Sequence, residues 1–314
     1  MSFPLHPSIA IVGAGAVGGY YGARLAQHGA DVHFLFRSDY SAVRSKGLVV
    51  QSHDGDFTLP PERVRAYDDP QKMPAVDLLI VALKTTSNDQ LASLVSPLLK
   101  PGTMILTLQN GLGNEELLAD QFGAERVLGG LAFVCINRIA PGVIRHTDHG
   151  LIRLGDFTGP TSSTPRARAI SDLFNASGIR CEVLDDLRYG RWEKLVWNVP
   201  FNGLGAALDL PTGRILATED GRRLVAQLMG EVIATAQAIG VALPGSVIRN
   251  QIERTPTMGD YRTSMQIDRQ ENRPLEVEAI LGRPLGVARS MGVSTPALEW
   301  LYRLVRLVNP GKTA

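Results

Sequence analysis

The sequence is poor in cysteine, in net charge and in long apolar runs. Its two cysteines, Cys135 and Cys181, stand far apart among 314 residues, so we expect buried thiols in a reducing compartment rather than a disulfide framework. The formal net charge is +1 and no run of basic residues stands out, which argues against a nucleic-acid or membrane-surface partner. No apolar run approaches the roughly 18 residues of a membrane helix, and the first residues lack the basic start of a signal peptide. We therefore expect a cytoplasmic globular protein.

The six histidines also lack the paired spacing on a helix that binds a metal ion. We expect no metal, and His146 and His149, on a predicted hairpin, are the weakest part of that expectation.

The length and the order of predicted elements indicate two domains. The strand Ser8–Val12, a helix over 15–28 and a strand over 31–36 form a βαβ unit, and apolar runs recur at 76–83, 103–108 and 127–134. Such alternation predicts a doubly wound, mostly parallel α/β sheet. We also predict a hairpin that turns at Asp148-His149-Gly150 and a last strand over 180–184. Helical patterns dominate afterwards, so we expect a Rossmann domain over 1–184 and an all-α domain over 185–314. The helices are expected at 189–198, 219–239, 244–253, 274–291 and 296–308.

The glycine motif Gly13-x-Gly15-x-x-Gly18 lies directly after a strand and opens a helix, which is the context of a dinucleotide-binding site. Gly13 permits the tight turn, Gly15 lets the pyrophosphate approach the backbone, and Gly18 lets the helix pack closely. The helix N-terminus supplies N–H groups and partial positive charge for phosphates. The alternative is a glycine turn that only packs.

The end of the second strand bears on the choice of cofactor. An NAD site usually carries an acid there, whereas this chain has Phe36-Arg37-Ser38. Arg37 could pair with a 2′-phosphate, which favours NADPH, unless it is an ordinary surface arginine; Asp39 leaves the preference open. Lys84 and Gln109-Asn110-Gly111 follow two other strands, where cofactors bind or where the chain merely turns.

Three polar residues at a spacing of four, Lys194, Asn198 and Asn202, fall on one face of a predicted helix. They suit the wall of a polar cleft, with Lys194 as a general acid whose pKa is lowered by partial burial and the asparagines as hydrogen-bond donors to substrate. A solvated helix face is the alternative. Ser264, Asp268, Glu276 and Glu278 add groups for binding substrate or orienting the lysine.

These motifs, taken in order, resemble the ketopantoate reductase (2-dehydropantoate 2-reductase) family over nearly the whole chain. The matching pieces are Gly13-Ala14-Gly15-Ala16-Val17-Gly18, Lys84, Gln109-Asn110-Gly111, Trp192-Glu193-Lys194 with Asn198 and Asn202, Ser264-Met265-x-x-Asp268, Glu276, and Gly292-Val293-Ser294-Thr295-Pro296.

The resemblance implies a Rossmann domain and a helical domain with the active site in the cleft between them. It implies NADPH-dependent reduction of 2-dehydropantoate to (R)-pantoate in pantothenate biosynthesis, with hydride added to the C2 carbonyl. Lys194 would be the general acid and Glu276 the acid that contacts the substrate hydroxyl and supports the lysine. Asn110, Asn198, Asn202 and Ser264 would bind substrate, and Lys84 and Asn110 would border the nicotinamide.

Departures from the family pattern lie at the substrate end, where Pro200 separates the two asparagines and Tyr261 precedes Ser264. The alternatives to ketopantoate reduction are an NADPH-dependent reductase of another 2-oxo acid and a non-catalytic NADP(H) sensor. We expect a small 2-oxo acid as partner; the oligomeric state stays open, with a homodimer as one option.

Overall fold

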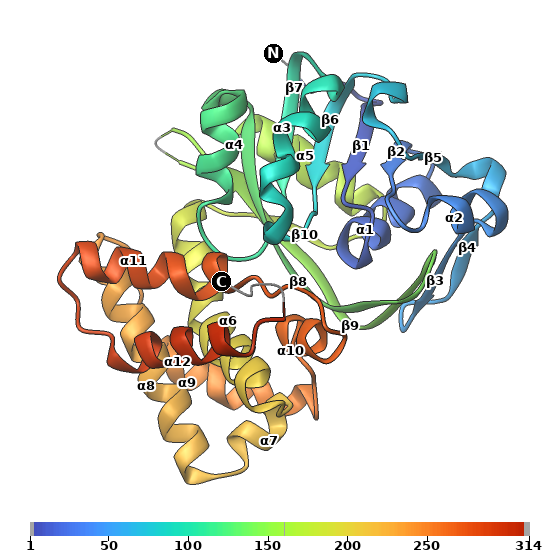
Figure 1. Cartoon of the computed structure of the whole chain (residues 1–314). Helices are drawn as coiled ribbons and strands as arrows, with labels where there is room; N and C mark the ends of the chain where they lie inside the picture. The colour runs from blue at the N-terminus through green and yellow to red at the C-terminus, as the bar shows by residue number, and fades with distance from the viewer. Residues whose placement is uncertain (1–2, 160, 311–314) are drawn as a thin grey trace. The chain divides into compact units, whose positions relative to one another are not determined.

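The computed structural model describes residues 3–159 and 161–310 of the chain (Figure 1). The chain divides into two compact units. The first comprises the residues up to Gln109 together with Asn114–Leu187, and the second comprises Asn110–Gly113 together with the chain from Arg188 onward. A four-residue loop thus leaves the first unit and packs with the second.

The first unit is built on one sheet whose strand order is β4-β3-β9-β8-β7-β6-β1-β2-β5, with β10 paired to β9. Strands β5, β2, β1, β6, β7 and β8 are parallel neighbours, whereas β8 with β9 and β3 with β4 are antiparallel. This agrees with the predicted mostly parallel α/β sheet. The strands are Ser8–Val12 (β1), Asp31–Leu35 (β2), Leu48–Ser52 (β3), Phe57–Leu59 (β4), Arg65–Tyr67 (β5), Val76–Val81 (β6), Leu99–Thr107 (β7), Val127–Ala140 (β8), Val143–Asp156 (β9) and Cys181–Val183 (β10).

Helices cover both faces of this sheet because its central strands are apolar on both sides. In β1, Ile9 and Ile11 face the core of α1 and α5, whereas Ala10 and Val12 face the core of α3 and α4. The helices of this unit are Ala16–Gln27 (α1), Tyr40–Lys46 (α2), Leu91–Val95 (α3), Asn114–Phe122 (α4) and Pro165–Ala176 (α5), with 3₁₀ turns at Pro61–Arg63, Pro70–Lys72, Thr85–Gln90, Ser96–Leu98 and Ala124–Arg126.

The predicted hairpin at Asp148-His149-Gly150 is wrong. Strand β9 runs through these residues, and the chain reverses between β8 and β9 at Pro141-Gly142. The turn-forming residues instead create an irregularity in the β8–β9 pairing, with a positive φ of 64° at His149 and 130° at Gly150. A β-bulge of this kind places residues that are typical of turns inside a strand, and the strand continues beyond them.

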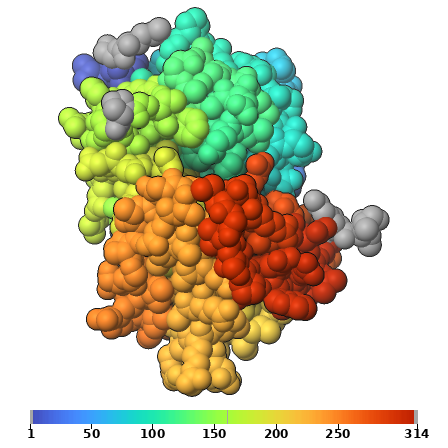
Figure 2. Space-filling view, turned by 90° about the vertical axis from the view of Figure 1, so that its left-hand side faces the viewer, coloured from blue at the N-terminus to red at the C-terminus, as the bar shows by residue number. Residues whose placement is uncertain are grey.

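The described residues of the second unit form helices joined by loops and turns, as predicted. Its helices are Leu187–Leu208 (α6), Thr212–Leu216 (α7), Glu219–Ala238 (α8), Ser246–Arg254 (α9), Ser264–Gln270 (α10), Arg283–Ser290 (α11) and Pro296–Leu307 (α12), with a 3₁₀ turn at Thr255–Met258 and a π-helical turn at Glu278–Gly282. Apolar residues of α6 and α8 form the core of this unit. Helices α11 and α12, red in Figure 2, both contact α8 and lie beside the orange helices.

Helix α6 is longer than the sequence predicts, because it continues through Pro200 to Leu208. Proline removes one backbone hydrogen bond. Buried side chains on both sides of Pro200, among them Trp192, Val196 and Phe201, pack into one core and hold the two halves in a single helix. The predicted helix over 274–291 is also shorter, and begins with the π-helical turn.

Both cysteines are buried, as predicted, and burial raises the pKa of Cys181 to about 12. Across the described residues, each helix is too short or too polar to cross a bilayer.

Candidate active site

The glycine loop between β1 and α1 has two glycines fixed by packing and one that the protein itself does not require. Gly13 has a φ of 95°, and a Cβ there would lie 2.5 Å from the Leu83 nitrogen. A Cβ on Gly18 would lie 2.4 Å from the Gly13 oxygen. Gly15 has a φ of −81° and a ψ of −139°, and a Cβ there would meet open space. Packing therefore does not require glycine at position 15, and the backbone there is open to the approach that the second glycine of a dinucleotide motif allows.

The N-terminus of α1 also fits an anion. Its first turn, which starts with Ala16-Val17-Gly18, carries no acidic side chain. The positive end of the helix dipole is therefore not neutralised from within the helix, and phosphate is the usual ligand of such a terminus after a glycine loop. Ala14 lies in the loop before α1, and Ala16 and Val17 are the first residues of the helix.

The acid nearest the tip of β2 is already engaged in the fold. The Asp39 carboxylate is buried; it accepts hydrogen bonds from Arg138 Nη1 at 2.9 Å and from the Gly142 backbone N–H at 3.0 Å, which tie it to the β8–β9 hairpin. Arg37 is exposed. The structure therefore gives Asp39 a structural partner and leaves a cationic side chain at the solvent-facing end of β2.

The ends of β6 and β7 are joined by an amide network. Gln109 Nε2 donates to the Leu83 carbonyl at 3.0 Å and to Asn88 Oδ1 at 2.7 Å, and Asn88 Nδ2 donates to Asn114 Oδ1 at 3.2 Å. Lys84, which is exposed, follows Leu83 at the start of a 3₁₀ turn. The network fixes the strand-end segment that carries Lys84 at the carboxyl edge of the sheet, where cofactors bind. Asn88 was not singled out from the sequence, because an isolated asparagine carries no signal.

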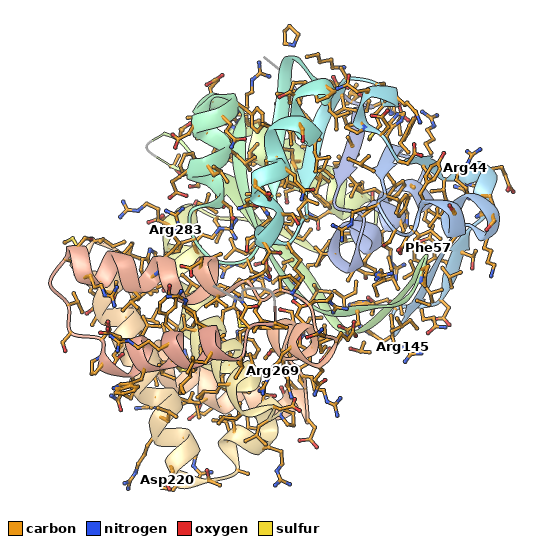
Figure 3. The ribbon with its side chains drawn as sticks, viewed as in Figure 1. Arg44, Phe57, Arg145, Asp220, Arg269 and Arg283 are labelled. Carbon is orange, nitrogen blue, oxygen red and sulfur yellow. The ribbon has the colours of Figure 1, made fainter. Side chains whose placement is uncertain are left out.

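The loop Asn110–Gly113 is held against the π-helical turn of the second unit. Leu112 N–H donates to the Ala279 carbonyl at 2.9 Å, and a Cβ on Gly111, whose φ is 85°, would lie 2.3 Å from the Ala279 oxygen. Gly113 lies against the side chain of Arg283, labelled in Figure 3. Only glycine permits this approach, which positions the Asn110 side chain.

This loop places the Asn110 side chain beside Lys194 of α6. The Lys194 Nζ donates to Asn110 Oδ1 at 2.9 Å. Burial lowers the pKa of Lys194 from 10.5 to about 7; the charge of Arg191 lowers it further, and the charge of Glu276 acts in the opposite direction. The direction agrees with the prediction from sequence. An ammonium with a pKa of about 7 exchanges its proton readily at neutral pH, which is the property of a general acid.

The two asparagines of α6 are both buried, at 6% and 4% exposure, so they do not form a solvated face. Asn202 Oδ1 accepts from the Met265 backbone N–H at 3.3 Å and from Ser264 Oγ at 3.4 Å. The structure therefore brings Ser264 and Asn202 together at the start of α10. Asn198 lies one turn earlier on α6.

Of the three candidate carboxylates, Glu276 raises the pKa of Lys194. Asp268 is paired with Arg273 Nη2 at 2.9 Å, and Glu278 accepts from the Tyr302 hydroxyl at 2.9 Å. Glu276 is 4% exposed and lies just before the π-helical turn. Arg191 lies one turn before Lys194 and is 5% exposed. The sequence does not predict its role, because a buried arginine cannot be distinguished from a surface arginine by its local sequence.

Two family models match this chain, one in its N-terminal part and one in its C-terminal part. The family model described as "Ketopantoate reductase PanE/ApbA" matches residues 9–159, and "Ketopantoate reductase PanE/ApbA C terminal" matches residues 186–309. A 2-dehydropantoate 2-reductase of Nostoc sp. is 48% identical over 96% of this chain and 94% of its own length.

Two solved structures extend this likeness to the fold. The 2-dehydropantoate 2-reductase of Geobacter metallireducens is 48% identical, with a TM-score of 0.93 over 96% of this chain and 100% of that one. The enzyme of Methylococcus capsulatus is 33% identical, with a TM-score of 0.85 over 96% of each chain. With both family models matched and identity close to one half over the full fold, the chain belongs to the ketopantoate reductase family, whose members are NAD(P)H-dependent oxidoreductases.

Proposed function

We propose that this chain reduces 2-dehydropantoate to (R)-pantoate with NADPH, in pantothenate biosynthesis. The observation that carries the proposal is Lys194, a lysine with a pKa of about 7 whose Nζ donates to Asn110 and feels the charge of Glu276. A proton donor tuned to neutral pH suits a reaction that creates an alkoxide. We assign cofactor binding to residues 1–184 and substrate binding with proton transfer to residues 185–314.

For the cofactor, the glycine loop Gly13–Gly18 and the N-terminus of α1 are assigned to the pyrophosphate. Arg37 is assigned to the 2′-phosphate, because Asp39 is committed to Arg138 and Gly142 and would otherwise select the free ribose hydroxyl of NADH. Lys84 and Asn110 are assigned to the nicotinamide end. When bound, NADPH supplies the hydride that adds to the C2 carbonyl carbon.

For proton transfer, Lys194 donates from Nζ to the oxygen that becomes the C2 hydroxyl. Asn110 Oδ1 holds the ammonium in place, and the buried carboxylate of Glu276 favours its protonated form, while Arg191 and burial keep the proton labile. We also assign Glu276 to the hydroxyl of the substrate.

For substrate recognition, Asn198, Asn202 and Ser264 are assigned to its oxygen atoms. The Oδ1 of Asn202 is engaged with the start of α10, so its Nδ2 is the group assigned to substrate. The Nδ2 of Asn202 suits a substrate carboxylate, and the Ser264 hydroxyl can join it by turning from Asn202 Oδ1 toward the substrate.

The test is the initial rate of NADPH oxidation with 2-dehydropantoate and with a panel of other 2-oxo acids. We expect the highest kcat/KM with 2-dehydropantoate. Turnover confined to another 2-oxo acid would identify that acid as the substrate and leave the proposed hydride and proton transfers in place. Tight NADPH binding without turnover on any acid would overturn the proposal in favour of an NADP(H) sensor.

A further inference from the structure

Three potential metal ligands converge in the first unit, on residues that the proposed reaction does not use. They are His53 and Asp54, just after β3, and His146 on β9; one ligand atom from each lies within 4.8 Å of the others. The parallel pairing of β3 with β9 sets Ser52 opposite His146, so the turn after β3 falls beside the His146 ring. The sequence alone does not predict this cluster, because His146 lies more than ninety positions after His53 and Asp54.

The hydrogen bonds of His146 determine which ring nitrogen is available. Its Nε2 lies 3.1 Å from the Asp148 carbonyl and 3.0 Å from the His149 carbonyl, so Nε2 carries the hydrogen. The left-handed backbone at His149 is part of the bulge that contains these carbonyls. Nδ1 therefore bears a lone pair, and it accepts from the Ser52 hydroxyl at 2.9 Å. A histidine anchored by one nitrogen on a backbone carbonyl is the usual arrangement behind a metal ligand.

The other two ligands lie near that nitrogen, where a bound ion would replace the hydrogen bond from Ser52. The Asp54 carboxylate is 3.9 Å from His146 Nδ1 and 3.1 Å from His53 Nδ1. Ligand atoms around a tetrahedral zinc ion with bonds of about 2.1 Å lie about 3.4 Å apart. His53 and Asp54 are exposed, so their side chains can rotate to bring the three ligand atoms to that spacing.

The turn that carries these ligands is well defined. Asp54 N–H donates to Ser52 Oγ at 3.1 Å, and Ser52 N–H donates to Asp56 Oδ1 at 2.7 Å. Phe57, labelled in Figure 3, follows on β4 and lies under the Arg24 guanidinium. Arg24 also donates to Ser52 Oγ at 3.2 Å, so one cation lies near the cluster, offset by the carboxylates of Asp54 and Asp56.

We propose that His53, Asp54 and His146 bind a divalent transition-metal ion of the zinc type, with water as a further ligand. Two imidazoles and one carboxylate select such ions over calcium or magnesium, which prefer oxygen ligands alone. The bound ion would fix the turn after β3 to the bulge in β9. The proposal is independent of the reductase activity.

The test uses tag-free protein, stripped with a chelator and titrated with Co²⁺ in the visible range, with Zn²⁺-dependent thermal melting as a second readout. We expect one ion per chain, visible bands of ligated Co²⁺, and a higher Tm with Zn²⁺. His53→Ala and Asp54→Asn, both at exposed positions, are expected to weaken binding roughly tenfold or more.

The matched control is His149→Asn, which removes a neighbouring exposed imidazole and keeps a residue that tolerates the left-handed backbone. Its Co²⁺ affinity should equal that of the unmodified chain. Absence of the visible bands and of the Tm shift, unchanged affinity in His53→Ala, or equal loss in His149→Asn would each overturn the proposal.

Discussion

Replacing Lys194 by methionine is expected to stabilise the fold while it removes most of the activity. The pKa of Lys194 is about 7 in the fold against 10.5 for an unperturbed lysine. Below the folded pKa, the fold must therefore hold an ammonium in a site that disfavours it. By linkage this costs at most about 4 kcal/mol at pH 7, and about 2–4 kcal/mol after allowance for the part of the side chain that meets solvent.

The sign of the pH dependence follows from the lowered pKa. Between about pH 7 and 10.5 the unfolded chain binds the lysine proton more tightly than the folded chain, so the stability of the unmodified protein rises with pH through this window. Lys194→Met lacks this titration. The gain in stability should be largest below pH 7 and should vanish above about pH 10.5.

The assay is urea unfolding of both proteins across this pH range, with Lys46→Met, at an exposed position of α2, as control. The same variant should lose roughly 10²–10⁴ in kcat with NADPH affinity retained, as expected for a missing general acid. A variant less stable than the unmodified protein at neutral pH, or a stability difference independent of pH, would refute the reasoning about burial; unchanged kcat would remove Lys194 from the mechanism.

Three further changes test the cofactor site and the helical unit. Gly15→Ala meets no protein atom, so it should leave Tm unchanged and weaken NADPH binding in calorimetry; unaltered affinity would contradict the ligand argument. Arg37→Ala should weaken NADPH more than NADH, and equal losses would exclude a 2′-phosphate contact. Glu231 accepts from the N–H groups of Ala297 at 3.0 Å and Leu298 at 2.8 Å at the start of α12. Glu231→Ala should lower the free energy of unfolding by about 1–3 kcal/mol, with a smaller loss for Glu231→Gln; an equal loss would argue against capping.

Local patterns were sufficient for much of the fold. Apolar runs and the glycine turn predict β1, α1, β2 and β6, because each of these elements is specified by its own residues. The hairpin at Asp148–Gly150 was predicted wrongly, since turn residues also build bulges inside a strand. The sequence predicts an end of helix α6 that is too early, because the apolar residues that pack on both sides of Pro200 lie far along the chain.

The site was predictable to the same extent. Spacing placed Lys194, Asn198 and Asn202 on one helix, and the lowered pKa of the lysine followed from expected burial. Three features of the site depend on contacts between residues far apart in the sequence: the packing of loop Asn110–Gly113 onto Ala279, the effect of Arg191 on the pKa of Lys194, and the hydrogen bonds of Asp39. The local sequence does not show whether a carboxylate is hydrogen-bonded within the fold.

An isotope label follows the hydride from NADPH to the substrate. The chain is incubated with 2-dehydropantoate and NADPH that carries deuterium in place of both hydrogens at C4 of the nicotinamide, and the product is examined by mass spectrometry and chiral chromatography. We expect (R)-pantoate with one deuterium, located at C2. Pantoate without deuterium, deuterium at another carbon, or no pantoate at all would contradict it.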